Sequence, residues 1–113
     1  HNQCLIIDCH SFPAQPLPYE NDLNRPDICI GTDSYHTSTE LKDCLLKVFE
    51  AFGYRVAIDS PFSGTIVPLK HYHKDKRVAS VMIEVNRSLY ASPSGFKRVQ
   101  SDLTHAILQA ATI

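Results

Sequence analysis

The sequence lacks four features that would place a protein in a familiar class. None of its apolar runs approaches the ~20 residues that a membrane-spanning helix needs, and no signal segment opens the chain. Its 11 Lys and Arg are balanced by 12 Asp and Glu, with no long block of one sign, which disfavours a nucleic-acid partner. No two of its four cysteines have the C-x-x-C spacing of a redox or zinc motif. We therefore expect a cytoplasmic protein that binds neither membranes nor nucleic acid.

The composition is that of one ordinary folded domain. With 113 residues, of which 43% are apolar and 20% charged, the chain is long enough for a single core but too short for two domains. We therefore expect residues 1–113 to form one domain. Three of the four cysteines lie in apolar runs, which favours reduced and buried thiols. The one basic cluster, between Lys70 and Arg77, is interrupted by Asp75 and is most simply an exposed loop.

Short apolar runs alternate with amphipathic segments, a pattern that predicts an α/β fold. Strands are expected at residues 4–7, 28–30, 55–58 and 78–85, and a surface loop with four prolines at residues 12–26. Interleaved strands and helices favour a layered α/β fold with a largely parallel sheet, which needs helices on both faces. Two helices cannot cover both faces of about four strands, so we expect either missing N-terminal sequence or a partner chain.

Two segments have the apolar spacing of amphipathic helices. The first is expected to begin at the capping box of residues 37–40 and to stop at Gly53. Its apolar stripe consists of Leu41, Cys44, Leu45, Val48, Phe49 and Phe52. The second is expected to be capped by Ser94 and to bury Phe96, Val99, Leu103, Ile107 and Ala110.

Glu84 is the most anomalous residue, because it interrupts an otherwise apolar strand. A buried carboxylate without a partner is unstable as an anion, so burial raises its pKa. A carboxyl whose pKa is raised toward neutrality suits a general base. The alternative is a structural role in which Glu84 pairs with Arg87 or with a helix terminus.

Asp8 and His10 form a second constellation at the end of the first expected strand. Residues two apart in a strand lie on the same face, so their side chains are neighbours. Imidazole is the commonest zinc ligand in proteins, and an adjacent carboxylate can orient it. A lone strand-end histidine is more often structural, since a mononuclear zinc site needs three protein ligands.

Other polar residues carry weaker indications. His71 and His73 have a spacing that could chelate a metal, although a lysine-rich stretch favours exposure to solvent. Neither His36 nor His105 is assigned a role. Ser11 and Ser63 have no base at a recognisable spacing, which argues against a serine nucleophile.

Four motifs follow one another along nearly the whole chain, at residues 7–13, 25–31, 60–64 and 83–90. In that order they resemble the second half of N-formylglutamate amidohydrolases. The resemblance implies a fold similar to that of zinc carboxypeptidases and aspartoacylase, here a partial three-layer α/β/α arrangement with a mostly parallel or mixed sheet. It also implies hydrolysis of N-formyl-L-glutamate, or of a related N-acyl amino acid, to formate and glutamate.

The same resemblance implies roles for four residues. His10 matches a zinc ligand at the end of a central strand, and Glu84 matches the glutamate that activates the zinc-bound water as general base. Arg25 and Arg87 are candidates for binding a substrate carboxylate, because a guanidinium group matches that geometry with two hydrogen bonds. A structural pairing with Asp27 or Glu84 is the alternative for these arginines.

The chain also departs from the family pattern. The upstream metal-binding motif has no counterpart here, so the remaining zinc ligands are not expected in this chain, and we expect either a missing N-terminal half or self-association. The glycine that follows the 60–64 motif in many relatives is Thr65 in this chain. We expect the fragment alone to be inactive as an enzyme. The runner-up function is a binding or oligomerisation domain that keeps the fold without metal.

Overall fold

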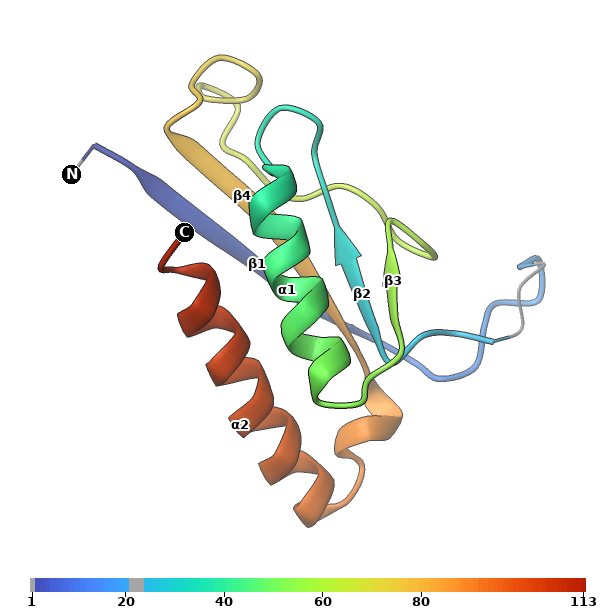
Figure 1. Ribbon diagram of the computed structural model, residues 1–113. Coiled ribbons are helices and arrows are strands. Elements are labelled where there is room, and N and C mark those ends of the chain that lie inside the picture. Colours follow the sequence, from blue (N-terminus) through green and yellow to red (C-terminus); the bar gives the residue numbers. More distant parts are fainter. Residues whose placement is uncertain (1, 21–23) are drawn as a thin grey trace.

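The computed structural model describes residues 2–20 and 24–113. Its strands and helices are arranged as a sheet with two helices and a short 3-10 helix, shown in Figure 1. In chain order the elements are β1 (Cys4–Phe12), β2 (Ile28–Gly31), α1 (Thr39–Ala51), β3 (Val56–Ile58), β4 (Val78–Asn86), η1 (Arg87–Tyr90) and α2 (Pro93–Ala110). All four expected strands and both expected helices are present, which confirms the predicted α/β class.

The described strands form one mixed sheet in the order β1-β4-β2-β3. β1 runs parallel to β4 and β2 runs parallel to β3, whereas β2 and β4 are antiparallel. β2, α1 and β3 form the strand, helix, strand unit that the sequence predicts. Two parallel strands need a crossover element between them, and α1 is that element. β4 and β2 are the two central strands and are buried along almost their whole length, whereas β1 lies at an edge of the sheet.

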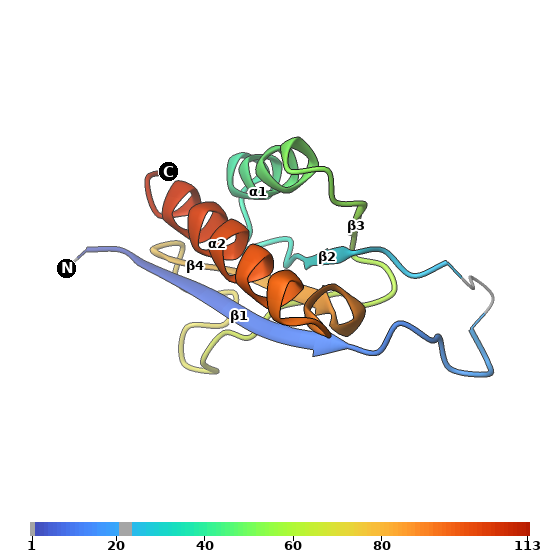
Figure 2. The ribbon, with the colours of Figure 1, turned by 90° about the horizontal axis from the view of Figure 1, so that it is seen from below.

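Both helices lie on one face of the sheet, as Figure 2 shows, and they pack against each other. The core fills the space between them and the sheet. From β4 it takes the alternate residues Val81, Ile83 and Val85, which point toward the helices. The described residues therefore build two layers of the expected three-layer arrangement.

The opposite face of the sheet is crossed by residues 60–67, which we call the crossing segment. Ser80 Oγ of β4 donates a hydrogen bond to the Ile66 carbonyl oxygen at 2.7 Å, and Cys29 Sγ of β2 donates to the Phe62 carbonyl oxygen at 3.2 Å. Gly31 allows the closest approach, since a Cβ atom at this position would lie 2.3 Å from the carbonyl oxygen of Gly64. The segment is thus attached to the two central strands.

Two helix starts differ from the predicted ones. The α1 N-cap is Ser38 and not Thr37, because the Ser38 hydroxyl accepts the hydrogen bond from the Leu41 amide at 3.0 Å. The α2 N-cap is Ser92 and not Ser94, since Pro93 already occupies the first helical turn. The predicted stop of α1 at Gly53 is confirmed, with φ at 92° in the left-handed region that favours glycine.

Some burial predictions were wrong. Phe96 was expected in the core but is 55% exposed in the first turn of α2. Cys4 and Cys9 are exposed because β1 is an edge strand, and only Cys29 of the four free cysteines is fully buried. Neither of the described helices is long and apolar enough to span a membrane.

Candidate functional site

The sheet brings His10 and Glu84 side by side. In the parallel pairing of β1 with β4, His10 lies directly opposite Glu84, close to the carboxyl ends of both strands. Both side chains belong to the face that carries the crossing segment, because they alternate with residues that face the helices. Cys29 of β2 lies opposite Glu84 on its other side. Two sequence-predicted site residues, 74 positions apart, are therefore brought together.

Glu84 is a buried carboxylate, 6% exposed, to which none of the described residues donates a hydrogen bond. Burial raises the pKa of its carboxyl, and the negative charge of Asp8 raises it further. The charges of His10, Arg87 and Arg25 act in the opposite direction, but the pKa stays raised. A partly desolvated carboxyl with a raised pKa has the character expected of a general base.

His10 is held by Asp8 within the same strand. His10 Nε2 lies 2.7 Å from Asp8 Oδ1, and the second carboxylate oxygen of Asp8 accepts a hydrogen bond from the Ile66 backbone amide at 3.0 Å. The His10 side chain is 51% exposed, so its ring is accessible from solvent. The sequence-based expectation that the two side chains are neighbours is confirmed.

The side chains at this site can supply only part of the coordination shell of a metal ion. Within residues 2–20 and 24–113, no group of three His, Cys, Asp or Glu side chains is arranged to hold a metal. A catalytic zinc takes three protein ligands. His10 supplies one imidazole whose second nitrogen, Nδ1, has no hydrogen-bond partner among the described residues. Further ligands would have to come from outside these residues.

Arg87, at the start of η1, is exposed and bound to the end of β1. Its Nε donates to Ser11 Oγ at 3.0 Å, and its Nη2 donates to the Ser11 carbonyl oxygen at 3.3 Å. Arg87 therefore makes no hydrogen bond to Glu84, and the structural pairing considered from the sequence is absent. The remaining guanidinium donor, Nη1, has no hydrogen-bond partner among the described residues.

Arg25 is buried to a much greater extent, at 6% exposed. It forms an ion pair with Glu20 and donates from Nη1 to the Pro13 carbonyl oxygen at 3.1 Å. The rings of Phe12 and Phe62 lie 5.5 and 5.4 Å from its guanidinium carbon. Neither Asp27 nor Glu84 is its partner, and its buried Nε donates no hydrogen bond within the part of the chain that the structure describes. Arg25 lines a pocket of about 220 Å³ together with Glu20, Arg55, Ser60 and Pro61.

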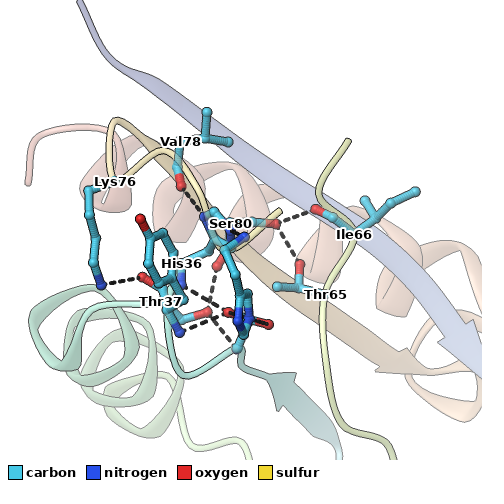
Figure 3. Close-up of polar contacts among 10 residues, drawn as sticks. His36, Thr37, Thr65, Ile66, Lys76, Val78 and Ser80 are labelled. Atoms are coloured by element: carbon cyan, nitrogen blue, oxygen red, sulfur yellow. Dashed lines mark hydrogen bonds and ion pairs between the residues drawn. The ribbon is translucent and has the colours of Figure 1, made fainter. Parts of the chain in front are cut away.

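Sequence reasoning missed a polar cluster around His36, at the opposite end of β4 from Glu84. His36 is 3% exposed; its Nδ1 donates to the Val78 carbonyl oxygen at 2.7 Å, and its Nε2 accepts from the His73 amide at 2.8 Å. Figure 3 shows this cluster next to Ser80 and Ile66. Its residues come from three distant segments, and no local spacing signals such an arrangement.

The histidines of the basic loop do not form a chelating pair. His73 Nε2 lies 3.0 Å from an oxygen of Asp33, and His71 Nδ1 lies 3.8 Å from an oxygen of Asp75. Burial raises the pKa of Asp33, but hydrogen bonds from His73 and from two backbone amides outweigh it and lower the pKa to about 2. His73 and Asp33 thus help to hold the loop against the sheet.

Comparisons with known proteins identify a matching family and similar folds. The family model described as N-formylglutamate amidohydrolase matches residues 1–91. The fold is similar to the crystal structure of N-formylglutamate amidohydrolase from Ralstonia eutropha, with a TM-score of 0.69 and 24% identity over 94% of this chain and 41% of that one. It is also similar to a gene product of Agrobacterium tumefaciens, with a TM-score of 0.62 and 18% identity over 96% of this chain and 40% of that one.

The chain spans about 40% of the length of these two solved proteins. No curated protein matches the sequence. The family match covers all of β1 to η1 and therefore includes all four predicted site residues, His10, Arg25, Glu84 and Arg87.

Proposed function

The chain belongs to the N-formylglutamate amidohydrolase family, and from this premise we propose that its parent protein is a zinc-dependent amide hydrolase. The substrate is N-formyl-L-glutamate or a related N-acyl amino acid, and the products are formate and glutamate. The chain forms the C-terminal portion of the catalytic domain, with a fold like that of zinc carboxypeptidases. Its span of about 40% of the solved relatives supports a longer parent.

One observation carries the proposal, namely the Glu84 carboxylate on the central strand next to His10. Burial raises its pKa, and none of the described residues neutralises it with a hydrogen bond. The carboxylate is desolvated without a hydrogen bond from any described residue, which is unfavourable for the fold, yet its oxygens still reach solvent, since they are not among the fully buried side-chain atoms that lack a partner. Retaining it is reasonable when the carboxylate has to accept a proton during the reaction.

Glu84 and His10 have different roles in the proposed reaction. Glu84 takes a proton from the attacking water and delivers it to the leaving amide nitrogen. His10 provides one ligand of the metal, and zinc, when bound, would acidify that water and polarise the substrate carbonyl. The remaining ligands come from parts of the parent outside the described residues.

Of the two arginines, Arg87 has the guanidinium group that is more available to a substrate carboxylate. It is exposed at the carboxyl ends of β1 and β4, and its Nη1 is not engaged by the described residues. Arg25 already has Glu20 as its ion-pair partner, so it contributes to substrate binding mainly by shaping the site. We therefore expect loss of Arg87 to raise KM, with a smaller effect on kcat.

The experiment uses the full-length parent protein, purified with its metal. We expect bound zinc, formate release from N-formyl-L-glutamate, and loss of turnover on chelation that zinc restores. A set of N-formyl amino acids with acidic and apolar side chains then defines the substrate, and the R87K and R87Q variants test the carboxylate contact. A parent that binds no divalent metal, or that hydrolyses none of these substrates, would show that the proposed activity is wrong.

A further inference from the structure

Asp8 connects the candidate metal ligand to the crossing segment. One of its carboxylate oxygens contacts His10 Nε2 at 2.7 Å, and the other accepts from the Ile66 amide at 3.0 Å. Its side chain is only 17% exposed, compared with 51% for His10. Since both oxygens are engaged by different donors, the orientation of the carboxylate is set from two sides.

This contact determines which nitrogen of His10 carries the proton. A carboxylate only accepts hydrogen bonds, so Nε2 has to be the protonated nitrogen of a neutral ring. Nδ1 then keeps its lone pair, which is the state that a metal ligand requires. Nδ1 is also the nitrogen that no described residue contacts by a hydrogen bond.

We propose that Asp8 is a positioning residue that holds His10 with Nδ1 as the metal-binding nitrogen. Asp8 takes its own position from the Ile66 amide, so the crossing segment supports the ligand through the carboxylate. The identity of the bound metal rests on the proposed function, whereas the protonation pattern of the His10 ring does not. The alternative is an exposed ion pair, which requires a protonated ring and leaves the neutral ring unrestrained.

Two substitutions separate these explanations. Asp8 serves two donors, and an asparagine of the same shape offers only one acceptor oxygen, so D8N loses at least one of the two contacts. D8A loses both. D102N is the matched control on the helix side, where Asp102 accepts from the Tyr54 hydroxyl at 2.7 Å and pairs with Arg98.

The experiment is ¹⁵N NMR of the histidine rings in the metal-free, full-length protein, at a pH at which imidazole is neutral. The His10 signals are assigned by their loss in H10Q. We expect His10 to be fully in the Nε2–H form in the wild type and in D102N, and to be a mixture of forms in D8A and D8N. We also expect the Ile66 amide to exchange with solvent at least tenfold faster in D8A.

Metal affinity provides an independent readout. Residues that orient a metal-bound histidine typically contribute about 10- to 100-fold to affinity, so D8N should bind zinc that much more weakly. The proposal is overturned if the ring pattern and the Ile66 exchange rate are unchanged in D8A and D8N. A wild-type ring in the expected form together with an absence of amide hydrolysis would instead leave the role of Asp8 intact and contradict the proposed function.

Discussion

Replacing Gly31 with alanine tests whether the crossing segment is held in place by the sheet beneath it. The added Cβ atom would lie 2.3 Å from the Gly64 carbonyl oxygen, whereas real Cβ contacts are essentially never closer than 3.0 Å. The segment must therefore retreat by at least 0.7 Å. The added Cβ atom would also lie 2.4 Å from Met82 Cε, but the methionine side chain can move aside more easily than the backbone.

Overpacking of this kind typically costs about 1 to 3 kcal/mol. For a domain of this size, each kcal/mol lowers the melting temperature by roughly 4 °C, so G31A should melt roughly 4 to 12 °C lower. The displacement should also lengthen the Ile66 to Asp8 hydrogen bond, because Ile66 lies two residues beyond Gly64. Thermal unfolding measures the first effect, and amide exchange at Ile66 measures the second.

Gly53→Ala provides the control for G31A. Gly53 has φ at 92° and no atom within 4 Å of a Cβ position, so its replacement strains the backbone without a clash. We expect G53A to lower stability by a comparable amount while leaving the Ile66 amide unchanged. The reasoning is refuted if G31A is as stable as the wild type, or if both variants affect Ile66 equally.

Three further substitutions make separate predictions. E84Q should raise the free energy of unfolding at pH 7 in urea titrations, because it removes a buried charge, and the gain should shrink as acid protonates the raised-pKa carboxyl of Glu84. Burial and the hydrogen bond to Asp102 raise the pKa of Tyr54 to about 12. The stability that this raised pKa contributes should be present below pH ~10 and lost as the pH rises through 12. Unfolding curves at alkaline pH should therefore show a smaller loss of stability for Y54F than for the wild type. H36A should cost about 2 to 4 kcal/mol, because the amide of His73 and a β4 carbonyl both lose their partner, and an unchanged melting temperature would contradict this assignment.

The fold was largely predictable because the apolar patterns are local. The α1 stripe and the Gly53 stop identify one helix, and the apolar run before Asn86 identifies the central strand. The caps at Ser38 and Ser92 were missed by one or two positions, because several serines and threonines stand next to each other and each can cap a helix. Phe96 was misplaced since periodicity alone does not say where α2 leaves the sheet.

The candidate site was predictable in part. Glu84 stands out by burial logic, and the contact of Asp8 with His10 follows from strand alternation. Strand order is a tertiary property, so the pairing of His10 with Glu84 across β1 and β4 could not be derived from either motif alone. The ion pair of Arg25 with Glu20 could not be derived from the sequence either, because Asp27 lies closer to Arg25 along the chain and was the alternative partner considered for it.

The central claim is that Glu84 acts as the general base of an amide hydrolase, and kinetics of E84Q in the zinc-loaded parent test it most directly. General bases of this kind contribute about 10²- to 10⁴-fold to the rate. We expect kcat for N-formyl-L-glutamate to fall by that factor, with KM and zinc content nearly unchanged. A variant that folds, binds zinc and turns over at the wild-type rate would contradict the mechanism proposed for this protein.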